Sequence, residues 1–223
     1  MTVQALLFDL DGTLIDSMPL HHVAWRDWHA EMALPFDEDG FFLATAGRTN
    51  QEILAELFPS RSDDERGVMA ERKEDLYRLA AATQLGEVQG ALAAMRNARE
   101  RGLKLAICTA SPDKNIAVAF DRFGLGELVE TTVSPEQGFR GKPHPDLFVE
   151  AARRLGMSAE ACLVFEDAPL GVEAARRAGM PAFALTTTMP ATAFEGYPNL
   201  RGTAPDFLSV DLDRLLRSVS ASQ

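Results

Sequence analysis

Short apolar runs that end abruptly in polar residues recur along the chain. The first covers residues 5–8 and stops at residues 9–13, which read DLDGT. A continuous apolar run of this length is typical of a strand buried on both faces of a sheet, and a tight turn follows it. Similar runs predict further strands over residues 103–108, 128–133, 161–165 and 181–185.

Stretches with helical spacing separate these runs. They cover residues 88–101, 112–123, 145–155 and 169–178, and Gly, Ser or Pro residues flank them. We expect Ser111 to cap the second of these helices, with Pro112 in its first turn. The alternation of strands and helices predicts an α/β fold, a Rossmann-like parallel sheet with helices on both faces.

One long segment breaks the alternation, because it contains helical patterns and no convincing strand. Helices are expected there over residues 21–32, 49–58 and 63–82. The second begins with the spacing of a capping box, TNQE. We therefore predict an inserted all-helical domain of residues 17–85, and a core domain formed by residues 1–16 and 86–223.

Composition and charge exclude several classes of protein. The 223 residues are 46% hydrophobic and 25% charged, as in a soluble globular protein, and the formal net charge is −11. Such an acidic surface repels nucleic acid and anionic lipid, so neither is expected as a partner. We find no signal peptide and no run long enough to span a membrane, and expect a cytoplasmic protein. Cys108 and Cys162 lie in apolar runs and are expected as buried thiols.

Polar side chains follow the predicted strands at the points where the strands end. The carboxyl ends of parallel strands share one edge of a sheet, where ligands of such folds bind. We therefore expect convergence of Asp9, Asp11, Thr109, Glu166 and Asp167. Converging carboxylates repel one another unless a cation lies among them. Oxygen ligands favour a hard cation, and Mg²⁺ is the usual choice when the substrate carries phosphate.

The spacing of the two aspartates suits phosphoryl transfer. The Asp9 carboxylate can attack phosphorus and form an aspartyl-phosphate. Asp11, two residues on, can protonate the leaving oxygen and then act as a base toward water. Thr109 and the amides that lead into the helix after Ser111 can hold phosphate oxygens. Lys142, fixed between Gly and Pro, can balance the charge of the phosphate and of Asp9.

At these residues the sequence resembles the haloacid dehalogenase superfamily, over essentially the whole chain. Residues 8–13 (FDLDGT) resemble its first motif, and Thr109-Ala110-Ser111 resembles the second. Lys142-Pro143 and Glu166-Asp167 resemble the third and fourth, in the same order. Residues 165–171 (FEDAPLG) are similar to the subfamily that contains beta-phosphoglucomutase and many sugar phosphatases.

The resemblance implies a role for each matching core residue. Asp9 would be the nucleophile and a Mg²⁺ ligand, and Asp11 would be the acid/base and give its backbone carbonyl to the metal. Glu166 and Asp167 would complete the metal site. The residues implied to bind phosphate are Thr109, Ala110, Ser111 and Lys142.

The resemblance also implies that the helical insert is a cap that closes over the substrate. His21 matches a position near the substrate in the subfamily, although a packed or solvated helix start explains it equally well. Arg48 could reach a phosphate or a sugar hydroxyl from the cap, or be an exposed loop charge. Together these features predict a monomeric, Mg²⁺-dependent phosphatase of a small phosphorylated metabolite, such as a sugar phosphate.

The main alternative is a beta-phosphoglucomutase, in which a sugar hydroxyl instead of water accepts the phosphoryl group. The mutases that the sequence resembles carry a Lys before the cap glycine, Gly47, and an Arg three residues after it. Here these positions are Ala46 and Asn50, which weakens the mutase interpretation. A dehalogenase would lack the second aspartate, and a phosphonate hydrolase would need a suitably placed cap lysine, whereas Lys73 lies mid-helix.

A non-catalytic scaffold built on the same fold is a further alternative. Such a protein would have no need to keep a cluster of charges that costs stability when the metal is absent. The intact carboxylates and Lys142 therefore argue against it.

Overall fold

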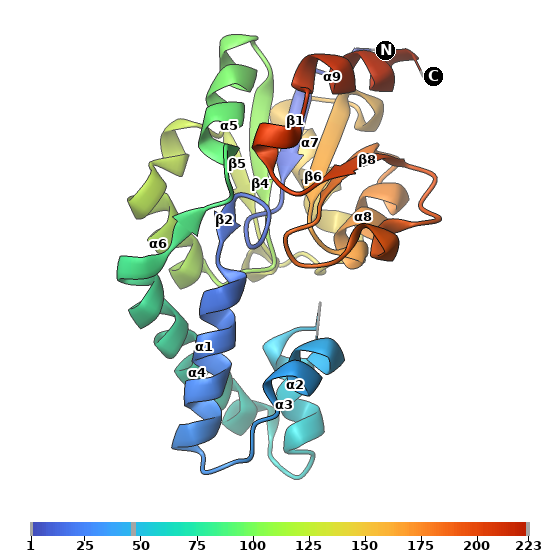
Figure 1. Cartoon of the computed structure of the whole chain (residues 1–223). Coiled ribbons are helices and arrows are strands. Elements are labelled where there is room, and N and C mark those ends of the chain that lie inside the picture. Colours follow the sequence, from blue (N-terminus) through green and yellow to red (C-terminus); the bar gives the residue numbers. More distant parts are fainter. Residues whose placement is uncertain (1, 46–47, 222–223) are drawn as a thin grey trace. The chain divides into compact units, whose positions relative to one another are not determined.

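The computed structural model describes residues 2–45 and 48–221. Contacts divide the chain into two compact units. The first, here called the core unit, comprises Met1–Asp16 and Gly86–Gln223, and the second, here called the helical unit, comprises Ser17–Leu85. Figure 1 shows both along the chain.

The core unit is built on a six-stranded parallel sheet with the strand order β5-β4-β1-β6-β7-β8. Its strands are β1 (Ala5–Phe8), β4 (Lys104–Cys108), β5 (Thr131–Val133), β6 (Cys162–Glu166), β7 (Ala182–Leu185) and β8 (Leu200–Ala204). Strand β1 lies between β4 and β6, and Phe8 pairs in register with Ile107 on one side and Phe165 on the other. The strand order reverses direction at β1, which is where ligands of open α/β sheets bind.

Two short strands join the points where the chain leaves and re-enters the core unit. Strand β2 (Ile15–Asp16) pairs antiparallel with β3 (Gly86–Glu87). The helices of the core unit are α5 (Ala91–Glu100), α6 (Asp113–Phe123), α7 (Asp146–Leu155), α8 (Pro169–Arg177) and α9 (Leu212–Ala221). Single 3₁₀ turns cover Leu125–Glu127, Pro135–Gln137, Ala159–Ala161, Ala191–Phe194 and Phe207–Ser209.

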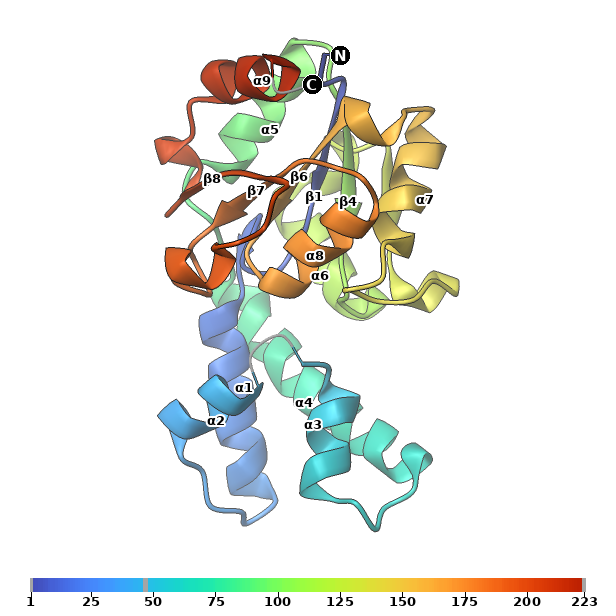
Figure 2. The ribbon, with the colours of Figure 1, turned by 90° about the vertical axis from the view of Figure 1, so that its right-hand side faces the viewer.

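The sheet is buried on both faces, and alternate residues of its central strands point to opposite sides. Leu7 and Val164 pack with apolar residues of α7 and α8. On the other face, the rings of Phe8 and Phe165 stack with centroids 5.2 Å apart, and Phe207 packs against both. Figure 2 shows α7 on one side of the strands and α5 with α9 on the other. The predicted α/β fold is therefore confirmed.

The helical unit has no strand among its described residues. Its helices are α1 (Met18–Glu31), α2 (Glu38–Thr45), α3 (Asn50–Leu57) and α4 (Asp63–Gln84). Trp25, Trp28 and Leu54 form its buried apolar centre. Capping boxes begin both α3 and α4, because Thr49 and Ser62 each exchange hydrogen bonds with a glutamate three residues on.

Several predicted boundaries are wrong, for local reasons. The helix expected from residue 88 begins at Ala91, because the Val88 amide donates to Leu14 and Gly90 has φ +79°. The strand expected over residues 128–133 is shortened to Thr131–Val133 by a preceding 3₁₀ turn. Helix α1 begins three residues before the predicted start, with Pro19 in its first turn.

The two cysteines are buried free thiols, as predicted. Burial raises the pKa of the Cys162 thiol to about 11. Across residues 2–45 and 48–221, no helix combines the length and the hydropathy needed to cross a bilayer.

Candidate active site

The carboxyl ends of three neighbouring strands bring the predicted site residues together. Asp9 follows β1 directly, Thr109 follows β4, and Glu166 is the last residue of β6. The Asp9 amide donates to the Phe165 carbonyl at 2.9 Å, which keeps the chain in sheet register up to Asp9. The site is thus built on the most buried part of the sheet.

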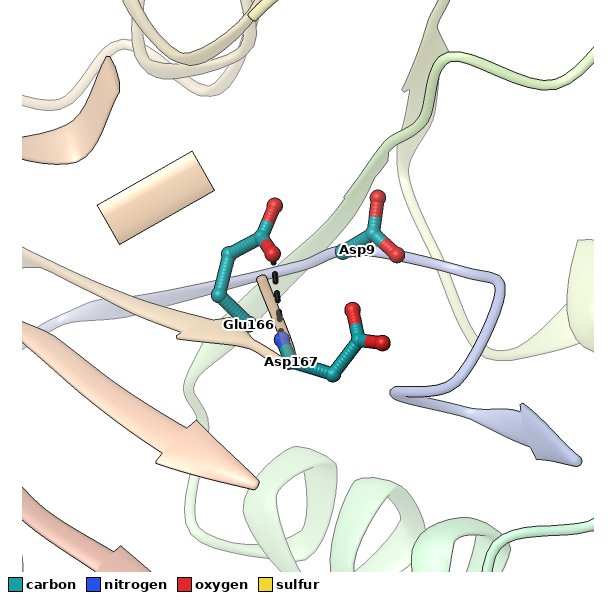
Figure 3. Close-up of side chains that lie close together, drawn as sticks. All are labelled: Asp9, Glu166 and Asp167. Carbon is teal, nitrogen blue, oxygen red and sulfur yellow. Dashed lines mark hydrogen bonds between the residues drawn. The ribbon is translucent and has the colours of Figure 1, made fainter. Parts of the chain in front are cut away.

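Three carboxylates form the centre of the site. Asp9, Glu166 and Asp167 are 7%, 1% and 4% exposed, and oxygens from all three lie within 4.8 Å of one another. Figure 3 shows them facing a common space. Glu166 Oε2 accepts hydrogen bonds from the amides of Asp167 at 3.0 Å and Ala168 at 3.1 Å. These bonds fix Oε2 in place. The other oxygen, Oε1, is left to contact Lys142.

A glycine in the following helix makes room for the Glu166 side chain. A Cβ placed on Gly171 would lie 1.9 Å from the Glu166 carboxyl carbon and from Oε1. Any larger residue at position 171 would therefore displace the carboxylate.

Lys142 contacts two carboxylates of this cluster. Its ammonium donates a hydrogen bond to Asp9 Oδ1 and forms an ion pair with Glu166 Oε1 at 2.5 Å. The lysine side chain is 9% exposed, and its Nζ lies 5.4 Å from the centre of the Phe148 ring. Burial lowers the pKa of Lys142, but the Asp9 and Glu166 carboxylates outweigh it, so the pKa lies above its ordinary value.

Lys142 does not fully balance the negative charge of the three carboxylates. Burial raises the pKa of Asp9 well above its ordinary value, and Glu166 and Asp167 raise it further against the opposing effect of Lys142. Burial and the Glu166 carboxylate raise the pKa of Asp167 to about 7. Three buried oxygen donors with excess negative charge fit a hard divalent cation such as Mg²⁺.

The Asp11 carboxylate contacts the loop that follows β4. Its Oδ2 accepts a hydrogen bond from the Ser111 hydroxyl. The Ser111 amide in turn donates to Thr109 Oγ1 at 3.0 Å. Thr109 and Ser111 are buried, and Ala110 lies exposed between them. Asp11 is thereby held at the loop that was predicted to bind phosphate.

The predicted capping role of Ser111 is wrong. The N-cap of α6 is Pro112, which makes no side-chain cap hydrogen bond, and the helix begins at Asp113. The Ser111 hydroxyl instead donates its hydrogen bond to Asp11, so it contacts a site residue and does not cap the helix.

The two predicted cap residues lie in the helical unit, and their role in binding stays a prediction. The His21 ring stacks on Tyr77, with centroids 4.0 Å apart, and His21 Nδ1 lies 2.7 Å from Lys73 Nζ. Arg48 donates to the carbonyls of Ala44 and Glu52 and pairs with a glutamate, Glu56, at 2.8 Å.

Sequence reasoning missed a buried polar cluster in the helical unit. Lys73 is 2% exposed and pairs with Glu74 Oε1 at 2.9 Å, and the Asn50 amide donates to the same oxygen at 2.6 Å. The signal was present: Lys73 lies four residues after Met69 and four before Tyr77, on the apolar stripe of α4.

Two threonines at the core site were also missed. The Thr188 hydroxyl donates to Asp167 Oδ2, and the Thr187 hydroxyl donates to the Gly12 carbonyl. Both directly follow a predicted strand, at the sheet edge where the other site residues lie, and that position was the available signal.

Comparison with known proteins agrees with the motifs. The family model described as haloacid dehalogenase-like hydrolase matches residues 3–179. Hexitol phosphatase A of Escherichia coli (strain K12) is 32% identical over 175 residues, which cover 77% of this chain and 78% of the relative. Beta-phosphoglucomutase of Bacillus subtilis (strain 168) is 26% identical over 178 residues, covering 76% of this chain and 77% of that protein.

A solved structure extends the similarity to the whole chain. It is a HAD hydrolase, family IA, variant 3, from Entamoeba histolytica HM-1:IMSS, with a TM-score of 0.90 and 26% sequence identity. The match covers 98% of this chain and 100% of that chain. The fold, motifs and relatives therefore point to the same family.

Proposed function

The chain belongs to the haloacid dehalogenase-like hydrolases, and from this premise we propose that it is a Mg²⁺-dependent phosphatase of a small phosphorylated metabolite. Among its relatives is hexitol phosphatase A, which favours a sugar or sugar-alcohol phosphate as the substrate. The proposed route passes through an aspartyl-phosphate on Asp9.

The observation that carries the proposal is the contact of Lys142 with both Asp9 and Glu166. The Lys142 ammonium contacts both Asp9, the proposed nucleophile, and Glu166, a proposed ligand of the cation. Positive charge held at this point, in a buried site, can stabilise the oxygens of a transferring phosphoryl group without reorganisation. If Lys142 served only to stabilise the fold, an ion pair with one of the two carboxylates would be enough.

In the first half of the reaction, the Asp9 carboxylate attacks phosphorus and the bond from phosphorus to the substrate alcohol breaks. Asp11, in its protonated form, gives its proton to the departing oxygen. The Ser111 hydroxyl orients Asp11 for this transfer, and Thr109 lies in the same loop. The product alcohol leaves, and the phosphoryl group remains on Asp9.

In the second half, Asp11 takes a proton from water, the water oxygen attacks phosphorus, and inorganic phosphate leaves as Asp9 is regenerated. Bound Mg²⁺ supplies positive charge to the phosphoryl oxygens and to Asp9. Asp9, Glu166, Asp167 and the Asp11 carbonyl would hold it. Thr109, Ser111 and Lys142 would hold the phosphoryl oxygens.

The mutase remains the second candidate because a beta-phosphoglucomutase is among the relatives. One contact disfavours it. The Asn50 amide, at the position of the mutase arginine, is bound to the Glu74 carboxylate. Because Lys73 already pairs with that carboxylate, a second phosphate at this position would find no excess positive charge. Ala46 and Gly47, which enter the same comparison, lie outside the described residues.

A ³¹P NMR time course on a panel of phosphosugars tests the proposal, with Mg²⁺ and with chelator. The panel includes hexitol phosphates, and beta-glucose 1-phosphate with a trace of glucose 1,6-bisphosphate as primer. We expect free phosphate in the presence of Mg²⁺ only. Conversion to glucose 6-phosphate without net phosphate release would establish the mutase instead.

The matched control for this experiment is Asp9→Asn, which keeps the size of the side chain and removes the nucleophile. We expect turnover to fall by roughly four orders of magnitude or more, while circular dichroism shows an intact fold. Substantial Mg²⁺-dependent turnover by this variant would exclude Asp9 as the nucleophile.

A further inference from the structure

Three consecutive threonines follow β7, and their hydroxyls have three different partners. Thr186 donates to the Ala204 carbonyl on β8 at 3.4 Å. Thr187 donates to the Gly12 carbonyl, and Thr188 donates to Asp167 Oδ2. Thr186 therefore bonds to a neighbouring strand of the sheet. Thr187 and Thr188 contact the two loops that carry the acidic cluster.

Thr188 fixes the orientation of the Asp167 carboxylate. Asp167 is 4% exposed, and its other oxygen, Oδ1, lies 3.4 Å from the donating Thr13 hydroxyl. With a hydroxyl on each oxygen, the carboxylate cannot rotate freely about its terminal bond. Hydrogen bonds of this kind to a ligating carboxylate orient it and raise metal affinity.

Thr187 acts on the other loop. Gly12, whose carbonyl it binds, has φ +74° and lies in the turn directly after Asp9 and Asp11. A Cβ on Gly12 would lie 2.1 Å from Asp167 Oδ2 and 2.7 Å from the Thr188 hydroxyl oxygen. The turn, the Asp167 carboxylate and the threonine segment are thus in direct van der Waals contact.

We propose that Thr187 and Thr188 are positioning residues that tie the Asp9–Thr13 turn to the Glu166–Asp167 loop and thereby set the geometry of the cation site. Residues 187 and 188 are separated from both loops in sequence, so they add a bridge through a third segment to the direct contact that Thr13 makes with Asp167. The inference rests on the proposed function in one respect, that the cation is Mg²⁺.

The test is Mg²⁺ binding to the metal-free protein, followed by isothermal titration calorimetry, which needs no substrate. Thr188→Val removes the hydroxyl and keeps the shape. We expect it to weaken Mg²⁺ binding roughly 10- to 100-fold, as for other residues that orient metal ligands. Thr188→Ser, which restores the hydroxyl, should recover most of the affinity.

The neighbouring threonine provides the matched control. Thr186→Val removes a hydroxyl from the same turn that does not contact the site, and it should bind Mg²⁺ like the wild type. Thr187→Val should lower kcat at saturating Mg²⁺ more than it weakens Mg²⁺ binding, since it loosens the turn of Asp9 and Asp11. Melting temperatures in chelator report whether a variant has simply lost fold stability.

The outcomes separate this inference from the proposed function. Wild-type Mg²⁺ affinity in Thr188→Val, or an equal loss in Thr186→Val, overturns the positioning role even in an active phosphatase. If the wild type binds Mg²⁺ but hydrolyses no phosphate ester, the proposed function fails while weakened binding by Thr188→Val still supports the bridge. A wild type that binds no Mg²⁺ overturns the inference outright.

Discussion

The core unit and the helical unit each bury a lysine next to acidic side chains. The two sites differ in net charge. Lys142 faces the acidic cluster of Asp9, Glu166 and Asp167. Lys73 pairs with Glu74, Lys73 also contacts the His21 ring, and the Asn50 amide donates to Glu74. The first site has an excess of negative charge that a divalent cation can offset, and the second pair is balanced by itself.

This difference indicates what each region is suited to bind. A buried excess of negative charge is unfavourable unless a cation and its anionic ligand arrive, and the pKa of Asp167, raised to about 7 by burial and by Glu166, expresses that cost. A balanced pair has no such requirement. It offers no excess positive charge for a second phosphate, in agreement with the phosphatase proposal.

The largest effect on stability should come from removing the core lysine. Lys142→Met leaves Asp9 and Glu166 without their cation, and we expect the free energy of unfolding in chelator at pH 8 to fall by about 3–5 kcal/mol. Urea unfolding measures it. Lys104→Met is the control, since Lys104 donates to the Leu155 carbonyl at 2.6 Å, and should cost about 1 kcal/mol. Equal losses would contradict the proposed charge imbalance.

Next in size is the pH dependence of the metal-free protein. Because the pKa of Asp167 is raised from 3.8 to about 7 on folding, the folded state binds a proton that the unfolded state has released between these values. That contribution to stability is complete below about pH 4 and is lost as the pH rises through 7. In chelator, the wild-type melting temperature should therefore fall from pH 5 to pH 8 more steeply than that of Asp167→Asn. Parallel slopes would rule out this role of Asp167.

The balanced pair should show coupling without dependence on metal. Lys73→Met leaves the Glu74 carboxylate buried without its cation, and Glu74→Gln leaves the Lys73 ammonium buried without its anion. Each variant should therefore destabilise the protein. The double variant should lose less than the sum of the two, with a coupling energy of about 1–3 kcal/mol, unchanged by Mg²⁺. A double-mutant cycle in urea, with and without Mg²⁺, measures it. Additive effects would show that the two charges do not stabilise each other.

Two helix glycines give the smallest expected effects, and they have opposite signs. Gly171→Ala would press on Glu166 and should cost about 1–3 kcal/mol while weakening Mg²⁺ binding. A Cβ on Gly67, within α4, would lie 3.9 Å from Gln51 Nε2, which is ordinary van der Waals contact. Gly67→Ala should stabilise the helical unit by about 0.5–1 kcal/mol. Calorimetric melting tests both, and stabilisation by Gly171→Ala would contradict the packing described for Glu166.

The central strands could be predicted because burial on both faces makes their sequences continuously apolar. Strand β8 was not predicted, since Leu200–Ala204 contains Arg201 and Gly202 and is only partly buried at the sheet edge. Helices α2 and α9 were missed as well. Helix α2 has only eight residues and contains Gly40, which weakens a helical pattern, and no Pro or Gly directly flanks α9.

The site residues divide in a similar way. Asp9, Thr109 and Glu166 could be predicted to converge because each ends a buried strand, and parallel strands end at one edge. Thr187 and Thr188 could not be assigned partners, since their contacts cross 175 and 21 residues of sequence. Such contacts depend on how loops pack, which strand periodicity does not specify.

The central claim, covalent phosphoryl transfer through Asp9, is tested most directly by acid-quenching the enzyme during turnover and mapping phosphorylated peptides by mass spectrometry. The account predicts a phosphoryl group on the peptide that contains Asp9, formed with substrate and Mg²⁺, and absent in chelator and in Asp9→Asn. Turnover at the wild-type rate in Asp9→Asn, with no phosphoryl group on that peptide in the wild type, would contradict it.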